Sequence, residues 1–162
     1  MIQNDISKKI IIALDYDTKE SVINLCDQLD PSYCRIKVGK QLFTKLGPSI
    51  IDIIQKKNFE IFLDLKFHDI PVTVYKACIE AYKLGIWMLN IHLLGGEEMV
   101  KAAKEARDKE NPSALIVGVS LLTSHNDKSL EYLGLKNRVT AVKNLAILAE
   151  KSSIDGIVCS PS

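Results

Sequence analysis

The sequence predicts an α/β protein of the (β/α)8 TIM-barrel class, of which this chain carries about the first six βα units. Short apolar segments alternate with amphipathic helical segments, which is typical of βαβ units and a parallel sheet. Polar side chains follow nearly every apolar segment. A barrel gathers all its strand ends at one mouth, whereas an open, doubly wound sheet concentrates function at one switch point. We therefore favour the barrel.

Six segments are predicted to be strands buried on both faces, because they are rich in Ile, Val, Leu and Phe without strict alternation. They are residues 10–14, 34–38, 60–65, 87–91, 115–121 and 156–159. The polar residues at or just after their ends are Asp15, Lys37, Asp64, Lys66, Asn90, His92, Thr123 and Ser160.

Five helices are predicted between these strands, over residues 18–29, 48–57, 72–84, 97–109 and 137–151. The first follows Asp17, a favourable N-cap residue. Pro48 lies in the first turn of the second helix, where a missing N–H costs nothing. Gly85 ends the third helix.

A full (β/α)8 barrel usually needs about 250 residues, and this chain has 162. We expect residues 1–162 to form a single barrel domain whose C-terminal part is missing from this sequence. An open barrel leaves a parallel edge unpaired, and such an edge promotes aggregation.

The composition indicates an ordinary globular protein, with 47% hydrophobic and 25% charged residues and a net charge of +1. Lys and Arg are spread along the chain, which argues against a nucleic-acid or membrane surface. The N-terminus lacks the features of a secretory signal or a transit peptide, so we expect a cytoplasmic protein. The four cysteines show no metal-binding spacing and are expected to be free thiols.

The densest chemistry lies in FLDLKFHDIPVT, residues 62–73. Asp64 and Lys66 are two residues apart on a strand, so their side chains are expected on one face. Asp69 follows where the chain leaves the strand. A lysine between carboxylates stays protonated, and its ammonium can donate a proton to carbon and stabilise negative charge there.

A bare D-x-K-x-x-D pattern is equally compatible with a salt bridge at a strand end. Asp15 and Lys37 occupy the corresponding ends of the two preceding strands. Several ionised groups at one mouth are costly unless they serve a ligand, so their convergence favours an active site.

The segment FLDLKFHDIPVT resembles the signature of the orotidine 5′-monophosphate decarboxylase family. The supporting segments, in the family's order, are ALDYDT (13–18), RIKVGKQLFTKLGP (35–48), LGIWMLNIHLLGG (84–96), SLLTS (120–124) and DGIVCS (155–160). The resemblance covers almost the whole chain. It implies a carboxy-lyase that converts orotidine 5′-monophosphate to UMP and CO2 in pyrimidine biosynthesis, with neither a metal nor an organic cofactor.

The resemblance also assigns roles to individual residues. Lys66 matches the proton donor to C6 of the pyrimidine, and Asp64 matches the carboxylate beside the departing CO2. Lys37 matches the lysine that holds the sugar and orders the charge network. Asp15 matches the aspartate that binds a ribose hydroxyl, and Thr123 matches a residue that contacts the pyrimidine ring.

Three further residues, Asp69, Ile70 and Thr73, resemble residues that reach the active site of a neighbouring subunit, which implies a homodimer with shared sites. The family grips the phosphate with a loop after the sixth strand and a Gly–Arg segment near the eighth. Neither has a counterpart in this sequence, so a 162-residue piece alone is expected to be inactive or nearly so.

Three other functions remain open at this point. Sugar-phosphate decarboxylases and synthases of similar fold share D-x-K-x-x-D but use a divalent metal; the FHDIPVT continuation argues against them. A Schiff-base aldolase needs a neutral lysine, which the flanking aspartates oppose. A barrel that only dimerises or binds ligand weakly is the non-catalytic alternative.

Two histidines lie near the cluster. His92 could ligate a metal with Asp15 or Asp64, but Lys66 already supplies a cation there, so we interpret His92 as a pocket-lining residue. His68 is expected to point away from Asp64 and Lys66, into packing or a dimer surface.

Overall fold

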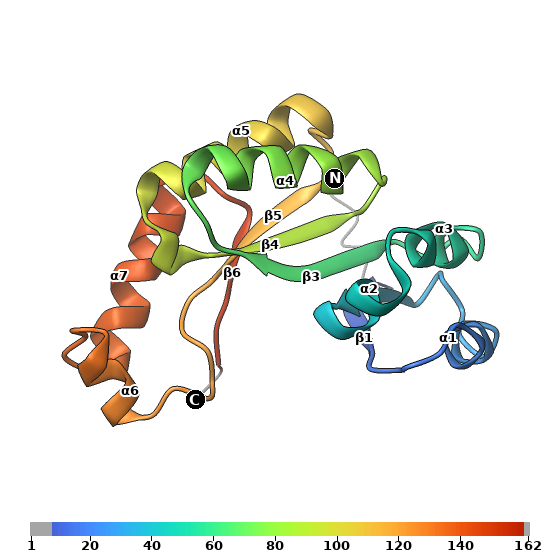
Figure 1. Ribbon diagram of the computed structural model, residues 1–162, viewed down its shortest axis with the longest axis horizontal. Coiled ribbons are helices and arrows are strands. Elements are labelled where there is room, and N and C mark those ends of the chain that lie inside the picture. The colour runs from blue at the N-terminus through green and yellow to red at the C-terminus, as the bar shows by residue number, and fades with distance from the viewer. Residues whose placement is uncertain (1–7, 161–162) are drawn as a thin grey trace, which may run out of the picture.

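The computed structural model describes residues 8–160 and contains a six-stranded parallel sheet (Figure 1). The strands lie side by side in chain order, with no reversal, and the sheet curls into a partial barrel. This confirms the predicted fold class. The N-terminal segment considered above as a possible signal lies mainly outside the described residues. The strands are β1 (Ile10–Leu14), β2 (Cys34–Gly39), β3 (Ile61–Phe67), β4 (Met88–His92), β5 (Leu115–Val119) and β6 (Gly156–Val158).

The helices cover the outer face of the curled sheet. Figure 1 shows α4 and α5 side by side on one part of it, with α1, α2 and α3 beside β1 and β2. Within residues 8–160, no helix is long and apolar enough to cross a membrane. The helices are α1 (Lys19–Cys26), α2 (Lys40–Leu46), α3 (Ser49–Gln55), α4 (Pro71–Lys83), α5 (Glu97–Glu110), α6 (Asp127–Tyr132) and α7 (Arg138–Lys151), with a 3-10 turn, η2 (Leu93–Gly95).

Both faces of the sheet are apolar over much of their length. On the helix-facing side, Leu63 and Leu89 are fully buried in the main core. On the inner side, Phe62, Met88 and Val117 form a separate buried cluster. Residues adjacent along a strand point to opposite faces, so the unbroken apolar character of these segments reflects burial on both sides.

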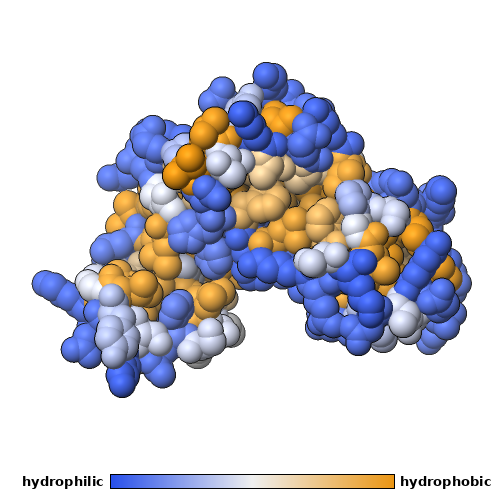
Figure 2. Space-filling view, viewed as in Figure 1, coloured by the Kyte–Doolittle hydropathy of each residue, from blue (hydrophilic) through white to orange (hydrophobic). Residues whose placement is uncertain are grey.

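A hydrophobic hollow of about 300 Å³ lies on the outer side of β3, with α4 on one side of it and the helices α2 and α3 on the other. Figure 2 shows this apolar surface in the middle of the molecule, with hydrophilic side chains around it. The hollow is lined mainly by Phe43, Pro48, Leu65, Phe67 and Leu84. It marks where the helices on either side of β3 do not meet completely.

Several boundaries differ from the prediction. Thr18, not Asp17, is the N-cap of α1, and its hydroxyl accepts a hydrogen bond from the Ser21 amide at 3.2 Å. The Asp17 carboxylate instead accepts a hydrogen bond from Gln41. The short helices α2 and α6 were not predicted. One or two helical turns establish an apolar period only weakly, and α3, of the same length as α2, was predicted with the help of Pro48.

An ion pair joins α5 to the turn that precedes β6. Arg107, whose side chain is 10% exposed, donates to the Ala114 carbonyl at 3.0 Å and pairs with Asp155 at 3.1 Å. The Asp155 carboxylate also accepts a hydrogen bond from the Ile116 amide at 2.7 Å. Asp155 therefore ties the start of β5 to the helix that covers it.

Replacing Asp155 with alanine should lower the free energy of unfolding by about 2 kcal/mol, because it leaves Arg107 without this carboxylate and the Ile116 amide without its acceptor. Chemical denaturation at pH 7 measures the change. An Asp52→Ala variant, in the exposed first turn of α3, should cost less than about 1 kcal/mol. Equal losses in the two variants would contradict the proposed contribution of Asp155.

Candidate active site

Three polar side chains from β2, β3 and β4 meet around the carboxylate of Asp64. Lys66 Nζ lies 2.5 Å from Asp64 Oδ1, and Lys37 Nζ lies 3.0 Å from Asp64 Oδ2. The Asn90 side-chain amide donates to Asp64 Oδ1 at 2.6 Å. Asp64 is 8% exposed and Asn90 is 1% exposed. The carboxylate is therefore buried between two ammonium groups and an amide.

Lys66 lies in a bulge of β3. Leu63 pairs with Leu89, but the next pair is Phe67 with Ile91, so β3 holds extra residues opposite β4. Lys66 has a φ of 52°, in the left-handed region that residues with a side chain rarely occupy. The sequence correctly predicted that Asp64 and Lys66 meet, but it did not predict that Lys66 lies in a bulge.

The environment of Asp64 favours its ionised form. Burial alone would raise the pKa of the carboxyl, but hydrogen bonds from Lys66, Asn90 and Lys37 outweigh burial and lower the pKa below its usual value. The carboxylate is thus charged at neutral pH and faces two cations. The Lys66 and Lys37 side chains are 28% and 25% exposed, so both ammonium groups also reach solvent.

The other residues predicted for the site lie around the mouth without joining the cluster. Asp15 is exposed directly after β1, and Thr123 is exposed in the loop after β5. Asp69 is exposed after β3, where its carboxylate accepts a hydrogen bond from the Ile70 amide at 2.6 Å. Ile70 is 62% exposed and Thr73 lies in the exposed first turn of α4. Within residues 8–160, no hydrogen bond or ion pair connects these five residues to Asp64.

Asn90 is a site residue that the sequence reasoning counted only as one of many polar residues at strand ends. The sequence does show an amide residue between apolar residues in the strand MLNIH. It does not show that Asn90 is buried or that it bonds to two residues, because both of these residues belong to a different strand.

The two histidines near the cluster lie against each other. The His68 and His92 rings are 5.4 Å apart and tilted by 44°. Burial, followed by the charges of His68, Lys40 and Lys66, lowers the pKa of His92. In the described part of the chain, no group of three or more His, Cys, Asp or Glu side chains is placed to hold a metal ion.

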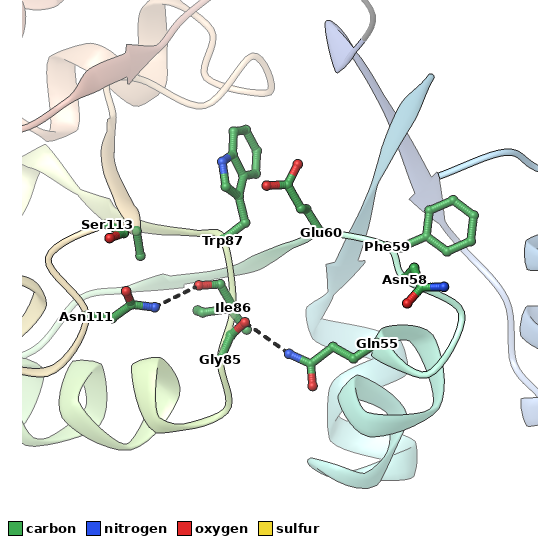
Figure 3. A pocket seen from close by; sticks show the side chains of 10 residues that line it. Gln55, Asn58, Phe59, Glu60, Gly85, Ile86, Trp87, Asn111 and Ser113 are labelled. Atoms are coloured by element: carbon green, nitrogen blue, oxygen red, sulfur yellow. Dashed lines mark hydrogen bonds between the residues drawn. The ribbon is translucent and has the colours of Figure 1, made fainter. Parts of the chain in front are cut away.

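A cavity of about 390 Å³ lies at the opposite, N-terminal ends of the strands (Figure 3). Two of the amide side chains that line it bond to backbone carbonyls: Gln55 donates to the Gly85 carbonyl at 3.0 Å, and Asn111 donates to the Ile86 carbonyl at 3.5 Å. At this face of a barrel, such residues usually serve stability rather than chemistry. The charged cluster at the C-terminal ends is therefore the candidate active site.

This cluster can act as a charged proton donor. Lys66 Nζ lies at the mouth, 2.5 Å from a carboxylate that stays ionised. In general an adjacent carboxylate favours the charged form of a lysine, whereas a Schiff base requires the neutral form.

Comparison with known proteins identifies the family of this chain. The family model for the orotidine 5′-phosphate decarboxylase / HUMPS family matches residues 8–162. A protein of Saccharophagus degradans named orotidine 5′-phosphate decarboxylase is 52% identical over 155 residues, which are 94% of this chain and 64% of that protein. The relative of the same name from Nitrosococcus oceani is 50% identical over 94% of this chain and 66% of its own length. The chain thus spans slightly less than two thirds of these relatives.

Solved structures of proteins with the same name have a similar fold. The orotidine 5′-phosphate decarboxylase of Lactobacillus acidophilus has a TM-score of 0.87 and 36% identity, over 94% of this chain and 71% of that one. The orotidine 5′-monophosphate decarboxylase of Methanocaldococcus jannaschii, in complex with the inhibitor BMP, has a TM-score of 0.78 and 26% identity, over 94% and 67% of the two chains. From the matched residues, the shared fold and the identities to these relatives, the chain belongs to the orotidine 5′-phosphate decarboxylase / HUMPS family.

Proposed function

We propose that the protein acts as an orotidine 5′-monophosphate decarboxylase, converting orotidine 5′-monophosphate to UMP and CO2. The observation that carries this proposal is the Lys66 ammonium, 2.5 Å from the buried carboxylate of Asp64 at the C-terminal ends of the strands. The names of relatives about half identical to this chain support the choice of substrate.

The proposed reaction needs an acid at one carbon atom. The bond between C6 and the carboxylate breaks, CO2 leaves, and the electron pair stays on C6 in the plane of the pyrimidine ring. Lys66 Nζ then gives its proton to C6, forming the C–H bond of UMP, and the neutral amine takes a proton from solvent. No cofactor is assigned to this chemistry, so the stabilisation of the carbanion falls to the protein's charges.

The magnitude of one contact shows that other interactions must contribute. An ammonium about 4 Å from the carbanion, at an effective dielectric of about 20, supplies roughly 4 kcal/mol. That corresponds to about a thousandfold in rate. The remainder is expected from the preorganised network of Asp64, Lys37 and Asn90, and from substrate binding away from the reacting carbon.

Other roles in the proposal follow from the family resemblance. Lys37 would hold the sugar and order the charges, as its contact of 3.0 Å with Asp64 supports. Asp15 would bind a ribose hydroxyl, and Thr123 would contact the pyrimidine. Their exposed positions after β1 and β5 leave them accessible to a ligand.

We also propose a cytoplasmic homodimer with shared sites. Asp69, Ile70 and Thr73 are exposed beside the candidate site, and Ile70 offers a 62% exposed apolar side chain that a partner subunit could cover. Cross-linking or sedimentation of the protein, with Ile70→Asp as the variant expected to be monomeric, tests the assembly.

The proposed activity is tested by following the absorbance change as orotidine 5′-monophosphate becomes UMP. In a protein that also carries the phosphate-binding segments described for the family, we expect turnover that EDTA does not abolish, whereas the 162-residue piece alone is expected to show little or none. Loss of activity on chelation would favour the metal-dependent sugar-phosphate enzymes instead. Borohydride trapping of the substrate on Lys66 would favour the Schiff-base aldolase. Absence of any conversion by the protein with those segments would contradict the proposed function.

A further inference from the structure

We propose that Asn90 is a positioning residue that fixes both members of the Asp64–Lys66 pair through the two ends of its side-chain amide. The effect on catalysis rests on the proposed function. The positioning itself rests on the geometry of β3 and β4.

Asn90 makes two hydrogen bonds that converge on the reactive pair. Its Nδ2 donates to Asp64 Oδ1 at 2.6 Å, and its Oδ1 accepts from the Lys66 backbone amide at 2.7 Å. The residue is 1% exposed, so water does not compete for either bond. One amide therefore fixes the carboxylate and the backbone that carries the ammonium.

The second bond replaces one that the sheet loses at the bulge. The pairing of β3 with β4 passes from Leu63 and Leu89 directly to Phe67 and Ile91, and Asn90 lies between these two pairs. The Lys66 amide thus bonds to the side chain of β4 rather than to its backbone. Because a left-handed φ costs a residue with a side chain of order 1 kcal/mol or more, it persists only where its surroundings impose it. The side-chain Oδ1 of Asn90, which accepts the hydrogen bond from the Lys66 amide, imposes this backbone conformation on Lys66.

An amide is suited to this position because it offers a donor and an acceptor together. A leucine of similar size would offer neither. An aspartate would keep the acceptor for the Lys66 amide, but when ionised it could not donate to Asp64 and would repel it. The Asp64 carboxylate to which the amide donates also pairs with Lys66 and Lys37.

The first test measures kcat and KM for orotidine 5′-monophosphate in Asn90→Leu and Asn90→Asp. We expect kcat to fall by about 100-fold in both variants, as is typical of small misplacements of a reacting group, while KM changes by less than about threefold. The matched control is Asn111→Asp, in the cavity at the opposite ends of the strands (Figure 3). It should leave both constants within about twofold.

The second test does not depend on activity. Hydrogen exchange of the Lys66 amide, followed by NMR, should be at least about tenfold faster in Asn90→Leu than in the unsubstituted protein, because its acceptor is gone. In Asn90→Asp the acceptor remains, so protection should persist although kcat falls. A general loss of structure would instead expose this amide in both variants.

The outcomes separate the two proposals. If a protein that also carries the phosphate-binding segments does not decarboxylate orotidine 5′-monophosphate, the proposed function fails, and the exchange of the Lys66 amide still decides whether Asn90 positions it. Unchanged protection in Asn90→Leu would overturn the positioning, and so would a kcat in that variant within threefold of the unsubstituted protein. If Asn90→Leu does not fold, the nearly isosteric Asn90→Asp decides the matter. Retained protection with a reduced kcat supports the inference, and any other combination overturns it.

Discussion

Replacing Lys66 with alanine is expected to lower kcat for orotidine 5′-monophosphate by at least about a thousandfold. The substitution removes the proposed proton donor to C6 and an electrostatic interaction worth roughly 4 kcal/mol at a distance of about 4 Å. Single-turnover measurement of UMP formation separates this chemical step from substrate binding and product release.

The fold should survive this substitution. In Lys66→Ala, Asp64 keeps its ion pair with Lys37 and its hydrogen bond from Asn90. A Lys45→Ala variant, in the exposed last turn of α2, serves as the matched control and should retain full activity. A Lys66→Ala enzyme with a kcat within tenfold of the unsubstituted protein would show that another group protonates C6.

Replacing Asp64 with alanine should lower the free energy of unfolding at pH 7 by about 3 kcal/mol. This value is at the low end for breaking a buried ion pair, because both lysines keep some contact with solvent. The substitution leaves Lys37 and Lys66 facing each other without an anion between them, and it removes the acceptor of the Asn90 amide. Denaturant titration of the two proteins gives the difference directly.

The pH dependence of this difference has a defined sign. The pKa of Asp64 is lower in the folded protein than its ordinary value, so the carboxylate stabilises the fold fully above the unfolded pKa of about 3.9. That stabilisation is lost as the pH falls through the folded pKa. We therefore expect the gap between the two proteins to narrow below about pH 4. A gap that widens with acid would contradict this, and Asp52→Ala, which lacks such partners, should show no comparable trend.

The strands could be predicted from the sequence because burial on both faces leaves a direct compositional trace. For β1 the predicted residues, 10–14, agree with the structure. β3 continues to Phe67, beyond the predicted end at residue 65, because the bulge that holds Lys66 extends the strand after its regular pairing stops. The bulge depends on how β4 pairs with β3, and no local pattern in residues 62–73 records that pairing.

The three charged residues of the site could also be predicted from the sequence, but the role of Asn90 beside them could not. Lys37, Asp64 and Lys66 lie together because parallel strands bring equivalent ends to one edge. The spacing of charges in the sequence indicated this convergence. It could not identify Asn90, whose importance depends on two bonds to a neighbouring strand. The contacts of Asp15 and Thr123 with a ligand remain predictions.

The positive φ of Lys66 sets its proposed catalytic role against the backbone preference for glycine at this position. Glycine occupies this region of backbone space without steric cost, so it would relieve the backbone there while giving up the ion pair with Asp64. Such a replacement would remove the ammonium. Sequence optimisation for heat resistance should therefore exclude position 66, since the change that relaxes the backbone most is also the one that removes the proposed acid.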